Sequence, residues 1–234
     1  VTGYIAIKMG WTNTKGIIDE QENYFQDKIE DDSWSKSEEW QVLKEAIKKD
    51  EVVIKRASKE TGVPSRIIVM PRVVAQLRLF HSGREIFKSV FAPLKILGNQ
   101  SQFSWGIMGI KQETAMQIEN NLAEDDHVLD FKTDDQNRER FERLTNEDDR
   151  YYSYLYGALM IKQLEEQWEK AGFPIDGRPE IIATLYNIGF ENSKPKANPL
   201  SGGAEVEINN IKYSFGSLAQ SFYDSDELID EFPT

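Results

Sequence analysis

Apolar side chains recur every three or four positions along most of the chain, the spacing that gathers them on one face of an α-helix. Trp40, Leu43 and Ile47 follow this spacing. Ser35 and Glu38 precede them at the spacing of a capping box, in which each side chain bonds a free backbone N–H of the first turn. The pattern predicts an amphipathic helix that begins at this box.

Glycine and proline mark the bounds of the next helices. A helix over about residues 51–60 is expected to end at Gly62, because glycine readily adopts the left-handed conformation that closes a helix. Pro64 suits the first turn of a third helix, and Pro71 is expected to kink that helix or to start a new turn. Its apolar positions fall on one stripe: Ile67, Met70, Val74 and Leu77.

The rest of the chain continues this alternation of helices and turns. An extended or loop-like stretch over residues 99–111 and a small hairpin within 190–213 are the expected non-helical elements. Residues 124–150 hold eleven acidic and five basic residues, which predicts a solvated excursion with a short helix near Phe141. Further helices are expected over about residues 83–97, 113–122, 154–171, 179–189 and 215–223.

These elements predict a mainly α protein with a small extended or hairpin element. Residues 1–34 are irregular, with several glycines and an acidic run, and residues 35–234 form the helical domain. A chain of 234 residues is long enough to bury a full core.

Composition narrows the classes of function. The net charge of -12 speaks against binding nucleic acid or anionic lipid, because both need basic patches, whereas a neutral or amphoteric polymer is not disfavoured. The chain has no cysteine, and His81 and His127 lack the spacing of metal ligands, so no metal site is expected. No apolar run is long enough to span a membrane.

Three separated segments carry a common motif pattern. Residues 104–110 read Ser-Trp-Gly-Ile-Met-Gly-Ile and are followed by Glu113-Thr114-Ala115. Residues 154–159 form a glycine-containing helix, and residues 183–189 read Ala-Thr-Leu-Tyr-Asn-Ile-Gly. In this order the segments resemble the lytic transglycosylase and goose-type lysozyme superfamily, and the resemblance covers about residues 50–225. Residues 62–64 also resemble the start of the family's catalytic helix.

The resemblance implies a lysozyme-like fold that holds the glycan strand of peptidoglycan. It implies cleavage between N-acetylmuramic acid and N-acetylglucosamine by a single Glu that acts as acid and then as base, with no cofactor. Tyr186 would orient that Glu or the substrate, and Asn187 would bond the backbone or an N-acetyl group. The implied cleft residues are Ser104, Trp105, Gly106 and Met108, of which Trp105 is suited to stack on a sugar ring.

The chain departs from the family pattern at the acid. The Glu is expected about ten residues after Pro64, where this sequence reads Val74-Ala75-Gln76. Three explanations are open: the acid has been replaced, with Ala75 the preferred position and Gln76 the second; the protein lacks it and only binds glycan; or Glu85, in an apolar context, supplies it. Gly109 also stands where the family has Gln.

The sequence therefore predicts a peptidoglycan lytic transglycosylase or lysozyme, with a non-catalytic glycan-binding or scaffolding relative as the alternative. A helical interaction protein without a glycan role is a third hypothesis. A peptidoglycan partner implies an extracytoplasmic location. The sequence opens on Val1 without an initiating Met, so a targeting segment or membrane anchor is expected to precede it.

Overall fold

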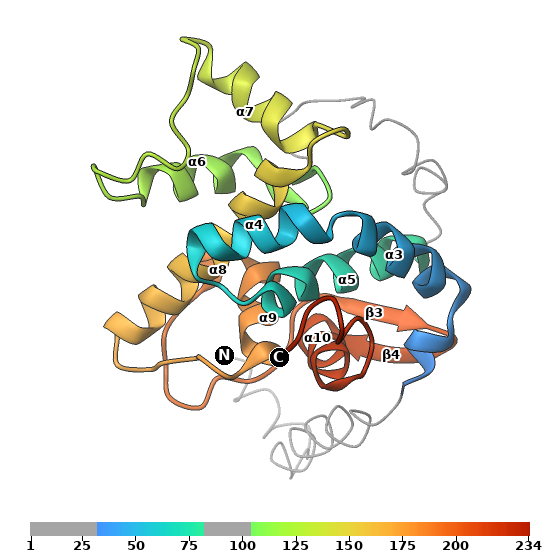
Figure 1. Ribbon diagram of the computed structural model, residues 1–234. Helices are drawn as coiled ribbons and strands as arrows, with labels where there is room; N and C mark the ends of the chain where they lie inside the picture. The colour runs from blue at the N-terminus through green and yellow to red at the C-terminus, as the bar shows by residue number, and fades with distance from the viewer. Residues whose placement is uncertain (1–31, 82–103) are drawn as a thin grey trace, which may run out of the picture.

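The computed structural model describes residues 32–81 and 104–234 of the chain. Helices dominate these residues (Figure 1). The strands found in them form two short antiparallel hairpins, of which Figure 1 labels the β3–β4 pair. The predicted class, mainly α with a small hairpin element, is confirmed. Most of the segment 1–34, the helix expected at 83–97 and the alternative acid Glu85 lie outside the described residues.

The first described helices differ from the sequence prediction at their start. A short 3-10 helix, η1 (Ser33–Lys36), precedes α3 (Glu38–Lys49). The cap of α3 is Ser37, whose Oγ accepts a hydrogen bond from the Trp40 backbone N at 3.2 Å. The predicted capping box of Ser35 and Glu38 is therefore wrong. Ser35 lies within η1, whose Trp34 side chain is fully buried, so residues 33–36 are in a 3-10 helix and the α-helix begins only after Ser37.

The next two helices begin and end close to their predicted bounds. Helix α4 (Glu51–Thr61) ends at Gly62, which has a φ of +80°. Helix α5 (Ser65–His81) runs on as one element through Pro71, so Pro71 does not start a new helix. The predicted apolar stripe of α5 is buried: Ile67, Met70, Val74 and Leu77.

A short hairpin and two helices follow, and the two helices lie in the upper part of Figure 1. Strands β1 (Ser104–Trp105) and β2 (Ile110–Lys111) pair antiparallel around a tight turn, and α6 (Gln112–Asn120) and α7 (Gln136–Thr145) come next. Helix α7 matches the short helix predicted near Phe141. The segment is not wholly solvated, however, because its arginines Arg140 and Arg143 are buried against carboxylates.

The long helix α8 (Tyr151–Lys170) leads from this upper part to the lower one. It is followed by α9 (Pro179–Ile188), the 3-10 helix η4 (Phe190–Asn192), the hairpin of β3 (Glu205–Ile208) and β4 (Ile211–Ser214), and α10 (Phe215–Asp224). Asn209 and Asn210 turn that hairpin with positive φ, a conformation that asparagine tolerates well.

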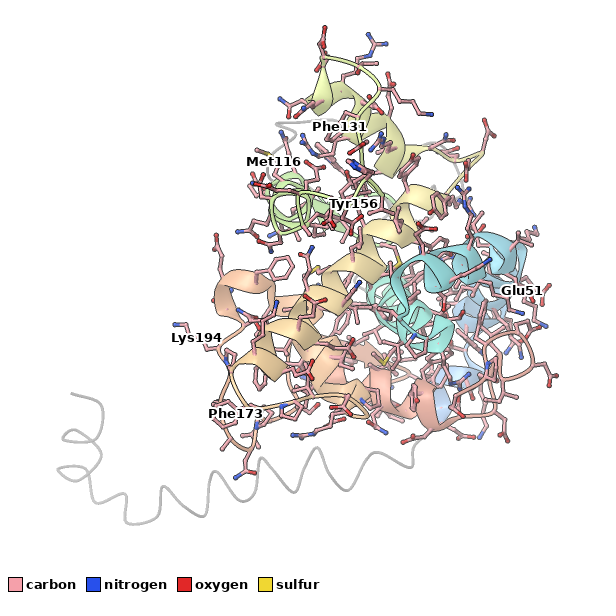
Figure 2. All side chains as sticks on the ribbon, turned by 60° about the vertical axis from the view of Figure 1, so that its left-hand side comes forward. Glu51, Met116, Phe131, Tyr156, Phe173 and Lys194 are labelled. Atoms are coloured by element: carbon pink, nitrogen blue, oxygen red, sulfur yellow. The ribbon has the colours of Figure 1, made fainter. Side chains whose placement is uncertain are left out.

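Two regions can be distinguished, with α8 running through both (Figures 1 and 2). We call α3, α4, α5, α9, α10 and the β3–β4 hairpin the body, and the β1–β2 hairpin, α6, α7 and the loop between them the upper lobe. Packing of α4 on α8 and of α9 on α10 provides much of the body's core. None of the helices in the two described ranges combines the length and the apolar character needed to span a lipid bilayer.

Arg66 ties the end of the described chain to the body. Its fully buried guanidinium lies on α5 and donates hydrogen bonds to five backbone carbonyls. These carbonyls belong to the end of α10 and the segment after it: Phe222, Tyr223, Ser225, Glu227 and Phe232. The contacts satisfy a buried charge with carbonyls at and beyond the end of α10.

Candidate functional site

The three segments that share the motif pattern meet at one place. The Tyr186 hydroxyl, near the end of α9, donates a hydrogen bond to the Met108 carbonyl in the β1–β2 turn at 2.8 Å. Gly157 lies beneath them on α8, where an added Cβ would be 2.5 Å from Met108 Cε and 3.4 Å from the Tyr186 hydroxyl. Glycine at 157 therefore allows the turn and α9 to approach α8 closely. We call Gly106, Met108, Gly157, Tyr186 and Asn187 the motif cluster.

The β1–β2 turn is held from the side of α7 and α8 as well. Gly106 has a φ of +64°, and a Cβ at this position would overlap the Leu144 carbonyl oxygen at the end of α7. The Met108 backbone N donates to Ser153 Oγ on α8 at 3.4 Å. The backbone of the turn is thus fixed at a position that only glycine permits at 106.

Tyr186 and Asn187 both bond backbone atoms. Burial raises the pKa of the Tyr186 hydroxyl above its ordinary value, so it remains a proton donor to the Met108 carbonyl. Asn187 Oδ1 accepts from the Ala204 backbone N at 2.9 Å, which ties the loop before β3 to the end of α9. Tyr186 and Asn187 therefore position the surrounding backbone.

Two of the expected cleft residues are covered by other side chains. Trp105 and Met108 are each 1% exposed, and the Trp105 ring meets Phe141 edge to face with ring centroids 5.2 Å apart. In this arrangement Trp105 cannot stack on a sugar, and Met108 cannot form an open wall, because both side chains turn toward α7 and α8 rather than toward solvent. Ser104 pairs with Lys111 through the strand backbone.

The two positions expected for the missing acid have different surroundings. Ala75 is half-buried and packs against the apolar core. Gln76, also half-buried, accepts a hydrogen bond from Arg72 Nε one helical turn earlier, with a distance of 3.4 Å. Arg72 is buried, and desolvation lowers its pKa to about 10. An apolar environment would raise the pKa of a carboxyl group at position 75, whereas the Arg72 guanidinium would lower the pKa of a carboxyl group at position 76.

Arg72 belongs to a buried network that was not predicted from the sequence. Asp50, between α3 and α4, accepts hydrogen bonds from Arg72 at 2.8 Å, from Arg150 at 3.2 Å and from the Tyr154 hydroxyl at 2.9 Å. The network links α4, α5 and α8 beside the position of Gln76. An arginine within the apolar run of residues 67–77 was the signal that could have predicted it, because a buried arginine needs a buried acceptor.

A half-buried acid lies away from the motif cluster. Desolvation, with Asp176 nearby, raises the pKa of Glu165 to about 7. Glu165 follows Gly157 by eight residues on α8, a rise of about 12 Å along the helix, so it is not placed to serve the same site. In the described ranges no group of three or more metal-ligating side chains is close enough to hold an ion.

No protein-family model matches this chain, and no curated protein or solved structure matches it significantly.

Proposed function

We propose that this chain has the glycan-binding site of a peptidoglycan lytic transglycosylase or lysozyme, at the bond between N-acetylmuramic acid and N-acetylglucosamine, and that it cleaves this bond when the catalytic Glu is restored at position 75. One observation carries the proposal. The three segments that the resemblance assigns to one site, far apart in the sequence, are in contact through Met108, Gly157 and Tyr186. This contact is what a shared site requires.

The surroundings of α5 favour Ala75 over Gln76 as the position for the acid. A general acid for glycoside cleavage needs a raised pKa, which an apolar environment supplies. A Glu at 75 would enter such an environment. A Glu at 76 would lie beside the Arg72 guanidinium, which favours the ionised carboxylate and would weaken it as a proton donor.

A non-catalytic role in glycan binding is the second candidate function. The observation in its favour is that α5, Ser65 to His81, contains no Asp or Glu at all. Glu85 lies outside the described residues and stays an alternative source of the acid. The two functions share the substrate and differ only in whether a proton is transferred.

Digestion of purified peptidoglycan separates them. The unchanged chain, Ala75→Glu and Gln76→Glu are each incubated with peptidoglycan, and the products are analysed by mass spectrometry. Ala75→Gln is the matched control, because Gln has the size of Glu but no acidic proton to donate. We expect anhydro-muropeptides, or reducing-end products for a lysozyme, from Ala75→Glu alone.

Other patterns identify the alternatives. Activity of the unchanged chain that is lost in Glu85→Gln would assign the acid to Glu85. Inactivity of every variant together with co-sedimentation with insoluble peptidoglycan would establish the non-catalytic role. Inactivity without co-sedimentation would refute the glycan proposal as a whole.

A further inference from the structure

A polar groove lies on the side of α8 that faces α6 and η4. It has a volume of about 450 Å³, within the usual range of about 300–1,000 Å³ for sites that bind small ligands. Figure 2 looks onto this side, with Met116 of α6 above and Lys194, just after η4, below. Four side-chain amides line the groove: Gln117, Asn121, Gln163 and Gln167. We call it the amide groove.

Three of these amides are held in place by the protein. Asn121 Nδ2 donates to Gln163 Oε1 at 3.2 Å, and Gln163 Nε2 donates to the Ile118 carbonyl at 2.9 Å. Gln167 Oε1 accepts from the Ser193 hydroxyl at 2.8 Å. The bonds of Gln163 and Gln167 restrain two half-buried side chains, so a ligand that meets them does not have to order them first.

The fourth amide has no such partner. Gln117 is half-buried, yet its side chain makes no hydrogen bond with any residue that the structure describes. A half-buried amide offers a carbonyl acceptor and two N–H donors at once. The groove thus presents an unused donor and acceptor beside amides that are already oriented.

The remaining lining residues supply an apolar wall and balanced charge. Phe190 of η4 is half-buried and contributes its ring to the groove. Lys170 and Glu166 are one helical turn apart, and their charged groups are 3.5 Å from each other. Since one positive and one negative charge face the groove together, it favours neither an anion nor a cation.

From this combination we propose that the amide groove binds a neutral oligosaccharide. Hydroxyl and N-acetyl groups donate and accept hydrogen bonds, as amide side chains do, and the C–H face of a sugar ring packs against an aromatic side chain. Gln163 and Gln167 lie six and ten residues beyond Gly157 on α8, roughly 9–15 Å along the helix, so this site is separate from the motif cluster. It does not depend on whether the chain cleaves peptidoglycan.

Titration of the whole chain with tetra-N-acetylchitotetraose, followed by calorimetry or NMR, tests the proposal. We expect Gln117→Ala to weaken binding roughly three- to tenfold, the usual cost of one hydrogen bond. Phe190→Leu, which keeps apolar packing and removes the ring, should weaken it as well. The matched control is Asn120→Ala, an exposed amide on α6 that does not line the groove. Thermal melts verify that all variants are folded.

Three results would overturn the proposal. One is the absence of binding at millimolar sugar. Another is binding that Gln117→Ala and Phe190→Leu change no more than Asn120→Ala does, since the sugar would then bind elsewhere. The third is binding of a peptidoglycan stem tetrapeptide in place of the sugar, with the same dependence on Gln117.

Discussion

The body and the upper lobe are stabilised by different chemistry. In the body, Trp34, Trp40 and Phe222 come from η1, α3 and α10 and meet edge to face, with ring centroids 5.0–6.1 Å apart. In the upper lobe, Arg140 of α7 donates two hydrogen bonds to the Glu119 carboxylate of α6, and the Tyr156 hydroxyl donates a third.

The two regions differ in how their stability responds to the substitution of a single residue. Apolar contacts are numerous and individually weak, so a cavity in the body weakens the whole region. A buried ion pair depends on both partners, because removing one leaves the other charged and desolvated. The motif cluster lies where the two regions meet, since the β1–β2 turn belongs to the lobe and Tyr186 to the body.

The largest effect is expected from Trp40→Ala. Removing this fully buried ring should lower the free energy of unfolding by about 3–5 kcal/mol, because the cavity cannot close. Chemical denaturation measures it. Val42→Ala is the control on the same helix, where the side chain is 52% exposed and the expected change stays within about 0.5 kcal/mol. Equal effects of the two variants would contradict a body held by apolar packing.

Glu119→Gln addresses the lobe. It keeps the size of the side chain and removes the charge that pairs with buried Arg140, at a cost of about 3 kcal/mol. Amide hydrogen exchange should show protection lost in α6 and α7 and retained in α5 and α10. The control is Glu142→Gln, whose pair with Arg138 is exposed and worth at most about 1 kcal/mol. Protection lost uniformly over both regions would show that they are one cooperative unit.

Glu165 gives the smallest effect and makes α8 sensitive to pH. Its pKa is raised from an ordinary 4.5 to about 7, so the folded state binds this proton more tightly than the unfolded state does. The stabilisation is complete below about pH 4.5 and is lost as the pH rises through 7. Between pH 4 and 8 the free energy of unfolding of Glu165→Gln should fall by roughly 1–2 kcal/mol less than that of the unchanged chain, as measured by denaturation. Glu169→Gln, exposed on the same helix, should leave the dependence unchanged, and an unchanged profile in Glu165→Gln would contradict the assignment.

The same contrast explains which elements could be predicted from the sequence. The helices of the body follow the apolar spacing of residues such as Leu43 and Leu77, and their ends follow from Gly62 and Gly189. The charged segment 124–150 was predicted to be solvated because periodicity does not reveal which arginine will meet which carboxylate. Burial of Arg140 and Arg143 depends on partners that only the folded chain brings near.

The candidate site was predictable in its backbone and less so in its side chains. The order of the motifs predicted that residues 106–108, 157 and 186 belong to one site, and these residues are in contact in the structure. The exposure of Trp105 was not predictable, because an aromatic residue in a turn packs inward or outward according to neighbours such as Phe141. The partners of Asp50 were hidden for the same reason, since they lie on two helices far along the chain.

The hydrogen bonds of Arg66 determine when the body can finish folding during synthesis. The arginine is synthesised early, but the carbonyls that accept its hydrogen bonds belong to residues 222–232, which are synthesised more than 150 positions later. Until they arrive, α5 carries a charge with no acceptor on the face it has to bury. The body can therefore complete the packing around Arg66 only after residue 232 has left the ribosome.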